Sequence, residues 1–372
     1  MKLLELFGGI GAPRKALQNI GVDVKSIDYV EILPFAVQAY NAMFDNNYKP
    51  QDITKWNLNV DLLAHGSPCV DFSSAGLNDI NTGRSILYQR TLEIIESELK
   101  PRPKYVLWEN VPGLLRAKHI EHFNHYLATM ESLGYKNEWA ILNSLDFGLP
   151  QSRNRIYCVS VRKDINKRFD FLKLVKVPMR PLIEFIDKDP VFMETNEFTV
   201  TQPSMIKSIE NGKTKIAVTY VNTITTKQVR WNTTVVFKDY KNFYTYPRKS
   251  DNKLINGFHN RAWKLDNFVG TIPASAVPQI GKMENWNLMF RYLTPRECFR
   301  LQGFTDEDYD NVIAKGIKRD SLYVLAGNSI PVPVLEAIFS QLLDIPIQTE
   351  DNQEEMDNSH LLDNLRTEDN YG

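Results

Sequence analysis

Short apolar runs alternate with amphipathic stretches through the first half of the chain, and this order constrains the fold more than any other feature. The candidate strands are Lys2–Leu6, Val24–Ile27, Asp61–His65, Tyr105–Trp108, Trp139–Asn143 and Ile156–Val161. The candidate helices between them are Pro13–Ile20, Phe35–Phe44, Ile86–Leu99 and Ile120–Leu133. Strands that alternate with helices predict a doubly wound, mostly parallel α/β sheet with helices on both faces.

The pattern changes past about residue 175. The apolar runs there are rich in Thr, Val and Tyr, which favours a second, smaller, β-rich domain; they are Val200–Ile206, Ala217–Ile224, Thr233–Phe237 and Asn242–Tyr246. Helical spacing returns at Pro295–Leu301 and Val332–Leu343. We therefore expect a catalytic domain at 1–175, a second domain at 176–290, a return to the first at 291–346 and a disordered acidic tail at 347–372.

Charge is unevenly distributed, although the formal net charge is only −1. Residues 348–372 carry eight Asp or Glu against Arg366 alone, whereas residues 176–290 carry sixteen Lys or Arg against ten Asp or Glu. A basic segment suits a polyanionic partner such as nucleic acid. A solvated surface with a chance excess of lysine and arginine would give the same count.

Cysteine usage and hydropathy restrict the class of protein. Cys69, Cys158 and Cys298 are far apart and odd in number, which argues against a disulfide framework or a Cys-rich zinc site. No uncharged apolar run reaches the length of about 18 residues that a membrane span needs. Met1–Phe7 has no cleavage-site pattern and is typical of a first strand. We expect a cytoplasmic protein without a bound metal.

The segment Phe7-Gly8-Gly9-Ile10-Gly11 follows the first strand and precedes a helix. Glycines at that point let the backbone turn tightly and approach a ligand at a helix N-terminus. Glu31, near the end of the next strand, has the spacing of an acid that binds ribose hydroxyls, and Asp52-Ile53 could contact an adenine ring. These features predict an adenosine-containing cofactor, for which NAD and S-adenosylmethionine fit equally well.

Two further groups follow strands of the predicted sheet, at the edge where ligands bind in such folds, and a third precedes the strand Ile156–Val161. Cys69 lies in the loop Gly66–Ser73 and is a candidate nucleophile, whereas Cys158 and Cys298 fall in strand-like and helix-like runs typical of a core. Glu109 has apolar neighbours that would raise its pKa and keep it protonated. Arg153 and Arg155 alternate along one extended segment, so they would project to the same side and bind phosphate or a base carbonyl.

Together, the order and spacing of these motifs resemble those of the C5-cytosine-specific DNA methyltransferases over residues 2 to 343. The matching segments are Phe7–Gly11, Glu31-Ile32, Asp52-Ile53, Pro68-Cys69, Glu109–Val111, Gln151–Arg155, Arg296–Phe304 and Gly327–Ile330. Val70 stands where the family usually has Gln, which puts the details of base flipping and recognition in doubt.

The resemblance implies roles for individual residues. Cys69 would add to C6 of cytosine, Glu109 would act as the acid at N3, and Arg153 and Arg155 would hold the base O2 or a nearby phosphate. S-adenosylmethionine would be held by Phe7, Gly9, Gly11, Glu31, Ile32, Asp52, Ile53, Pro68, Leu87 and Asn328. DNA would be contacted by Ser73, Arg230, Lys238, Lys241, Arg248, Lys249 and Arg261.

The expected activity is DNA (cytosine-5-)-methylation of a flipped base in double-stranded DNA, performed by a monomer in a restriction–modification system or by a solitary phage or bacterial enzyme. A restriction endonuclease would then be a functional partner without necessarily binding the chain. Three other hypotheses are a nicotinamide-dependent oxidoreductase, a catalytically silent DNA-binding relative and a tRNA methyltransferase of the same family. Retention of Cys69, Glu109 and Arg155 argues against the first two, and the extended second domain favours duplex DNA over tRNA.

Overall fold

A computed structural model describes residues 1–53, 60–67, 87–98, 101–187 and 293–346, together with short strands between residues 198 and 292. The expected strands Val200–Ile206 and Asn242–Tyr246 and the acidic tail from residue 347 lie outside the described residues. Six strands form one sheet in the order β2-β1-β3-β4-β7-β5. Their bounds are β1 Lys2–Leu6, β2 Lys25–Val30, β3 Leu62–His65, β4 Tyr105–Asn110, β5 Tyr135–Asn143 and β7 Asn154–Arg162.

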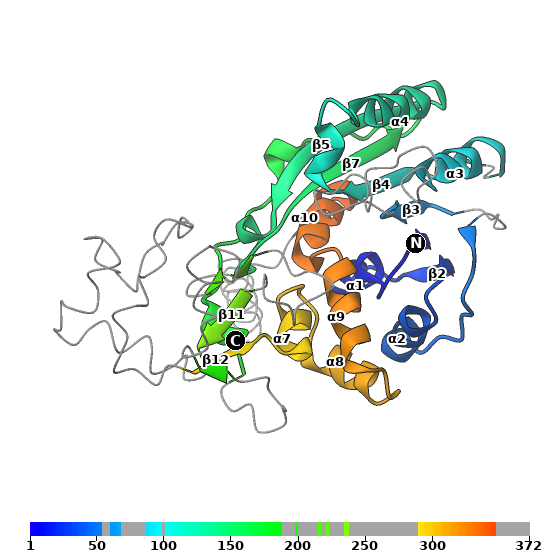
Figure 1. The fold of residues 1–372 in the computed structure, drawn as a ribbon. Coiled ribbons are helices and arrows are strands. Elements are labelled where there is room, and N and C mark those ends of the chain that lie inside the picture. Colours follow the sequence, from blue (N-terminus) through cyan, green and yellow to red (C-terminus); the bar gives the residue numbers. More distant parts are fainter. Residues whose placement is uncertain are drawn as a thin grey trace, which may run out of the picture.

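Helices cover both faces of this sheet, as the sequence predicts (Figure 1). Side chains alternate along β1, so that Leu3 joins a core with α1 while Leu4 joins a second core with α3 and α4. The helices of the first half are α1 Ala12–Asn19, α2 Pro34–Phe44, α3 Leu87–Glu93 and α4 Ile120–Ser132, and a π-helical turn, Ile94–Glu98, continues α3.

The strand β7 departs from the parallel order. It pairs antiparallel with both β4 and β5, whereas β1, β2, β3 and β4 pair in parallel. The expectation of parallel strands is therefore wrong for β7, although the sheet is mostly parallel. The reason is the connection, because residues 144–153 contain only the 3₁₀ turn Ser144–Asp146 and the short strand β6 Gln151–Ser152, too little for the helical crossover that parallel pairing needs.

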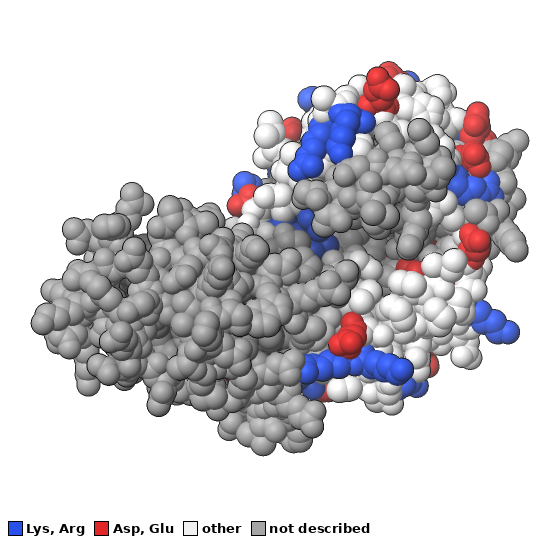
Figure 2. All heavy atoms as spheres, in the orientation of Figure 1, with Lys and Arg blue, Asp and Glu red and all other residues white. Residues whose placement is uncertain are grey.

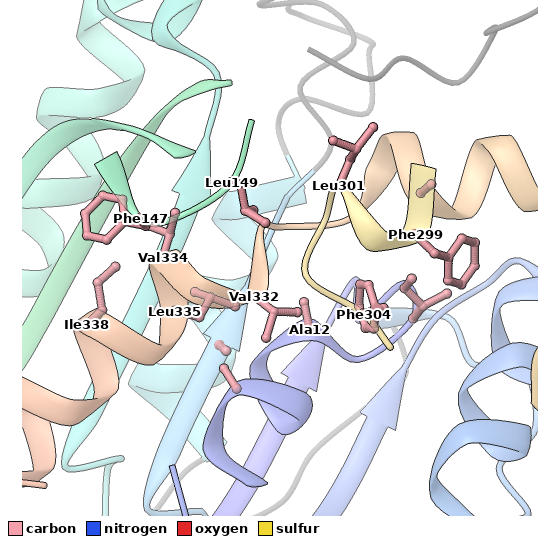
Figure 3. Close-up of a cluster of buried hydrophobic side chains, with 14 of the residues drawn as sticks. Ala12, Phe147, Leu149, Phe299, Leu301, Phe304, Val332, Val334, Leu335 and Ile338 are labelled. Carbon is pink, nitrogen blue, oxygen red and sulfur yellow. The ribbon is translucent and has the colours of Figure 1, made fainter. Parts of the chain in front are cut away.

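The C-terminal part of the chain returns to the first sheet and completes its core. It consists of α7 Pro295–Arg300, α8 Asp306–Ile313, α9 Arg319–Asn328 and α10 Val332–Leu343. Figure 3 shows Val332 and Leu335 of α10 beside Ala12 of α1, and Ile338 beside Phe147. The expected helices near residues 295–301 and 332–343 are confirmed, whereas α8 and α9 have no counterpart among the helices that we predicted.

A second sheet lies apart from the first, near α7 (Figure 1). Its strand order is β8-β12-β11-β9, with β8 Phe198–Thr199, β9 Lys215–Ile216, β11 Thr234–Phe237 and β12 Met289–Tyr292. The short strand β10 Val221–Asn222 pairs instead with β6, beside the first sheet. The expected strand Thr233–Phe237 corresponds to β11.

One stretch of the described chain, Arg319–Leu343, is long and apolar enough by composition to cross a membrane. It spans α9 and α10, which Ser329–Pro331 separates, and 72% of its most apolar window is buried inside the fold. Burial against the sheet explains its hydropathy, since core helices of globular proteins have the same composition.

Candidate functional site

The glycine segment forms the turn between β1 and α1, and its glycines have different physical roles. Gly9 and Gly11 have φ angles of 54° and 75°, in the left-handed region that favours glycine. A Cβ at Gly11 would come within 2.5 Å of Phe44, so that glycine is needed for packing. A Cβ at Gly9 would meet nothing within 4 Å. Gly9 is therefore the glycine whose backbone is open to a ligand.

Glu31 follows β2 and fixes this turn. One oxygen of its carboxylate accepts a hydrogen bond from the Gly9 amide at 3.1 Å, and the other accepts one from the Leu33 amide at 3.0 Å. Two backbone donors hold the carboxylate in one orientation beside the open glycine. The remaining lone pairs of its oxygens can accept hydrogen bonds from a ligand, which is the arrangement expected for a ribose-binding acid.

The other predicted cofactor residues of the first half lie around Glu31 or on the neighbouring core. The Gln51 amide donates to the Glu31 carbonyl at 2.9 Å, which puts Asp52 and Ile53 next to Glu31. Phe7 and Leu87 pack, half-buried, against the core cluster that contains Ile53. Ile32 is 63% exposed. Asp52 and Ile53 lie outside the strands, and the third strand of the sheet is β3, as the sequence predicts.

A pocket lies where the strand order reverses, between the ends of β1 and β3. Open α/β sheets bind their ligands at such switch points. The pocket is lined by the glycine turn, by Ala64–Gly66 at the end of β3, by Glu109 at the end of β4, and by Asn328–Ile330 after α9. The pocket therefore combines the predicted cofactor turn, the predicted catalytic acid and part of the motif Gly327–Ile330.

Glu109 is almost fully buried and lies beside Gly66, which follows β3. Burial raises the pKa of its carboxyl, while the positive charges of Arg155 and Arg153 lower it, and the net effect is a rise. The Arg155 guanidinium Nε lies 3.1 Å from Glu109 Oε1. A carboxyl with a raised pKa beside a fixed cation can stay protonated and donate a hydrogen bond.

Arg153 is 3% exposed, and its guanidinium contacts the motif Gly327–Ile330. Its Nη2 donates to the Gly327 carbonyl at 3.0 Å and to the Ser329 carbonyl at 2.8 Å. The two arginines therefore make different contacts: Arg155 pairs with Glu109, whereas Arg153 donates to the carbonyls on either side of Asn328.

Trp108 and Asn110 flank Glu109 and contact Ser67, which follows β3. Trp108 Nε1 donates to Ser67 Oγ at 3.0 Å, and Asn110 Nδ2 lies 3.4 Å from the Ser67 carbonyl. All three residues are buried. Ser67 is two residues before Cys69 in the sequence. We did not single out Ser67, because a serine in a loop gives no sequence signal of its own.

Glu5 is the second buried acid of the pocket wall, and we did not single it out from the sequence. Tyr40 Oη donates to its Oε2 at 2.6 Å, and the Arg14 amide donates to its Oε1. Burial raises the pKa of Glu5 to about 7, although the hydrogen bond from Tyr40 and the charge of Arg14 oppose that rise. Its position inside an apolar strand, Leu3–Leu6, was the signal that could have identified it.

The other sequence expectations have mixed outcomes. Cys158 and Cys298 are fully buried, which confirms their assignment to the core, and burial raises the pKa of Cys158 to about 12. Within the described residues, no group of His, Cys, Asp or Glu could hold a metal ion. The remaining predicted residues lie outside the described ranges; they are Pro68, Cys69, Val70, Ser73, Arg230, Lys238, Lys241, Arg248, Lys249 and Arg261.

Comparison with known proteins identifies a family over nearly the whole chain. The family model of C-5 cytosine-specific DNA methylases matches residues 1–344. The orphan methyltransferase M.SPRI of Bacillus phage SPR is 28% identical, over 94% of this chain and 99% of its own length. The type II methyltransferase M2.ScrFI of Lactococcus lactis subsp. cremoris is 31% identical, over 76% of this chain and 66% of its own length.

Solved structures show the same fold at lower identity. A mutant of Spodoptera frugiperda DNMT2 superposes with a TM-score of 0.65 at 19% identity, covering 92% of this chain and 99% of that one. Entamoeba histolytica methyltransferase EhMeth has a TM-score of 0.65 at 17% identity, with 92% and 98% covered. These likenesses establish the mixed α/β fold of the first sheet and its helices.

Proposed function

Because the chain belongs to the family of C-5 cytosine-specific DNA methylases, we propose that it transfers a methyl group to C5 of a flipped cytosine in a specific duplex DNA sequence. The observation that carries the proposal is the pocket shared by the glycine turn, Glu109 and Asn328. A cofactor held by the turn and a base held by the acid would meet there. Family membership also decides against the nicotinamide-dependent oxidoreductase.

The described residues fit S-adenosylmethionine, which when bound supplies a methyl group on a sulfonium. The oriented carboxylate of Glu31 would accept the ribose hydroxyls, and the open backbone of Gly9 would adjoin the ligand. Phe7, Ile53 and Leu87 belong to one apolar cluster, which offers a surface for the adenine ring. Asn328, in the pocket wall, would hold a polar end of the cofactor.

The chemistry proposed for the base uses three side chains. C5 of cytosine is a poor nucleophile, and addition of the Cys69 thiolate to C6 makes it enamine-like. The protonated Glu109 donates to N3 and stabilises the charge that develops on the ring. Arg155, fixed against Glu109, holds the base O2. After methylation, loss of the C5 proton and elimination of Cys69 restore the aromatic ring and the free thiolate.

The base has to leave the duplex before this reaction, which costs roughly a few kcal/mol. We assign the phosphate contacts and the base readout to the basic segment 176–290. The second sheet supports a separate unit there, because its strands all come from residues 198–292. On the described part of the face in Figure 2, both signs of charge are interspersed, so the lysine and arginine excess counted in residues 176–290 is the stronger candidate for a DNA footprint.

The points where this segment leaves and re-enters the first domain are tied together. The Asp187 carboxylate accepts hydrogen bonds from Arg300 Nη1 at 2.6 Å and from Thr294 Oγ1 at 3.4 Å, and the Asp187 amide donates to Glu297 at 2.8 Å. Close, clasped ends are typical of a domain inserted into another. We call Asp187, Thr294, Glu297 and Arg300 the clasp, and we place the inserted unit at residues 188–292.

We infer the biological setting from the kinds of protein to which the chain is similar. The curated relatives are an orphan phage enzyme and a type II enzyme, so we propose a bacterial or phage modification enzyme with or without a restriction endonuclease. We propose a monomer that acts in the cytoplasm on nucleoid DNA.

Bisulfite sequencing of DNA from cells that express the protein tests this function directly. We expect one short sequence to carry 5-methylcytosine at one position throughout the genome. A parallel sample treated to detect 5-methylcytosine in tRNA tests the alternative substrate. Modified tRNA together with unmodified DNA would overturn the proposed substrate. If the folded protein modifies no cytosine in either nucleic acid, the proposed reaction is wrong.

A further inference from the structure

The end of helix α9 carries Asn328 into the pocket, and a helix end of this kind leaves carbonyl groups unsatisfied. The last four carbonyls of an α-helix have no partner within the helix, and they carry the negative end of its dipole. Ala326 and Gly327 are buried within this last turn. The Ser329 amide donates to the Ala326 carbonyl at 3.3 Å, and further donors have to satisfy the remaining hydrogen-bonding capacity of these buried carbonyls.

Two side chains from distant parts of the sequence do so. Gln302 Nε2 donates to the Ala326 carbonyl at 2.7 Å. Arg153 Nη2 donates to the Gly327 carbonyl at 3.0 Å and to the Ser329 carbonyl at 2.8 Å, one residue to each side of Asn328. Both side chains are almost fully buried. A guanidinium against the carboxyl end of a helix is the favourable sign of charge for the dipole.

Two further hydrogen bonds fix the surrounding backbone. Gln151, two residues before Arg153, donates through Nε2 to the Leu301 carbonyl at 2.7 Å. The Val332 amide at the start of α10 donates to the Gln302 carbonyl at 2.8 Å. Arg153 and Gln302 thus hold the two ends of the loop between α9 and α10, and the loop cannot shift without breaking buried hydrogen bonds.

We propose that Arg153 is a positioning residue for the cofactor pocket: it caps helix α9 from outside and thereby places Asn328 and Ser329 against the cofactor. Arg155, its neighbour in the same motif, serves the base through Glu109. The two arginines of one short strand segment therefore divide their work between the two substrates. This inference rests on the proposed function, because it takes the pocket to be the S-adenosylmethionine site.

The physical reason for an arginine at this position is its shape and its permanent charge. A planar guanidinium can donate from one nitrogen to two carbonyls that flank a residue, and it keeps its charge when buried. A lysine side chain would place a single ammonium at a different distance from the two carbonyls, and burial would favour its uncharged form. The exchange of arginine for lysine should therefore loosen the loop without removing the positive charge outright.

The test compares Arg153→Lys with Arg155→Lys, the same chemical change two residues apart. Binding of S-adenosylhomocysteine is measured by calorimetry, and kcat and KM are measured on DNA that carries the target site. We expect Arg153→Lys to weaken S-adenosylhomocysteine binding about tenfold or more and to raise the KM for S-adenosylmethionine. We expect Arg155→Lys to leave that binding within about twofold and to lower kcat instead.

The opposite pattern would overturn the assignment. Arg153→Lys with unchanged S-adenosylhomocysteine affinity and a lowered kcat would place Arg153 at the base, like Arg155. Gln302→Met provides a second arm if Arg153→Lys does not fold, because it removes the other external partner of α9 at similar volume. It should also weaken S-adenosylhomocysteine binding, and unchanged binding in that variant contradicts the cap. Failure of the unmodified protein to bind S-adenosylhomocysteine would instead count against the proposed cofactor.

Discussion

The two sheets of this protein differ in how they are built. In the first sheet, strands of four to nine residues are mostly buried between helices, with the edge strand β5 partly exposed, and their ends bring a glycine turn, Glu109 and Arg155 to one edge. In the second, strands of two to four residues pair between segments as distant as Phe198 and Phe290. A long, covered strand fixes side chains to the precision that bond making needs. The difference supports a division between a chemical half and a half that selects the DNA sequence.

The largest effect should come from the nucleophile. We expect Cys69→Ser to abolish methylation, since a hydroxyl of much higher pKa cannot supply the attacking anion. DNA with 5-fluorocytosine at the target should form a covalent adduct with the unmodified protein, because fluorine cannot leave C5 as a proton. Denaturing gel electrophoresis detects that adduct.

Cys158→Ala is the matched control for Cys69→Ser. Cys158 is fully buried on β7, so its loss should reduce stability but leave adduct formation intact. If Cys69→Ser turns over near the rate of the unmodified protein, the reaction does not proceed through a covalent Cys69 adduct. The proposal that the residues at this edge of the first sheet perform the chemistry would then be wrong.

Loss of the acid should be the next largest effect. Glu109→Gln cannot give up a proton to N3, and we expect kcat to fall about 10²–10⁴-fold. Because burial raises the pKa of Glu109 and the protonated form is the active one, the rate of the unmodified enzyme should fall as pH rises through that pKa. Single-turnover rates from pH 5 to 9 measure this, and the descending limb should be missing from the variant. A wild-type rate in Glu109→Gln would assign the acid to another group.

Exchange of the inserted unit tests the other half of the comparison. Residues 188–292 are replaced by the corresponding segment of a relative with a different target, while the clasp at Asp187, Thr294, Glu297 and Arg300 is kept. We expect the hybrid to methylate the donor's site and to lose preference for its own by about 10³ or more. Sequencing of methylated DNA reports the site. An active hybrid that retains the original site would place recognition in the first domain.

Single basic residues of that segment should have smaller effects. A residue that touches only phosphate should weaken all sequences alike and lower the salt dependence of binding by about 0.9 in log–log slope. A residue that reads a base edge should cost roughly 1–3 kcal/mol at one position of the site. Alanine variants of Arg230, Lys238, Lys241, Arg248, Lys249 and Arg261, titrated with DNA at several salt concentrations, sort them into these two classes. If all six variants bind DNA as the unmodified protein does, these basic residues do not contact DNA.

Glu5 should make the stability of the first sheet depend on pH. Its pKa is about 7 in the folded chain against 4.5 for an ordinary glutamate, so the folded state binds the proton more tightly. The resulting stabilisation is complete below about pH 4.5 and is lost as pH rises to about 7, with a magnitude of about 3 kcal/mol. Urea unfolding at pH 5 and 8 measures it, and Glu5→Gln should reduce the difference. The exposed Glu121→Gln is the control and should change nothing.

Removal of the acidic tail should have the smallest effect. Truncation after Ile347 removes eight carboxylates that cannot contact phosphate favourably. We expect target choice and turnover within about twofold of the full chain, with non-specific DNA binding slightly tighter because like-charge repulsion is removed. Filter binding at low salt and a methylation time course check both. A folded but inactive truncation would assign the tail a role in the chemistry.

The sequence by itself determined the elements whose causes are local. The period of the apolar residues located β1, β3, β4 and α10 to within two residues. The glycine turn and Glu31 were identified because glycine content and the spacing of an acid can be read from residues that are close in the sequence. The order of the motifs was sufficient to indicate the family. The sequence also placed Cys158 and Cys298 in the core correctly, because Cys158 lies in an apolar strand-like run and Cys298 in a helix-like run.

Only the tertiary structure decided which distant groups meet. The sequence shows two similar arginines at 153 and 155, but one contacts Glu109 and the other binds carbonyls of Gly327 and Ser329. It does not show that β7 runs antiparallel, that Asp187 meets Arg300, or that burial holds the pKa of Glu5 near 7. Each of these depends on the packing of segments far apart in the chain, because hydrogen-bond partners and desolvation are properties of the folded core and not of the local residue order.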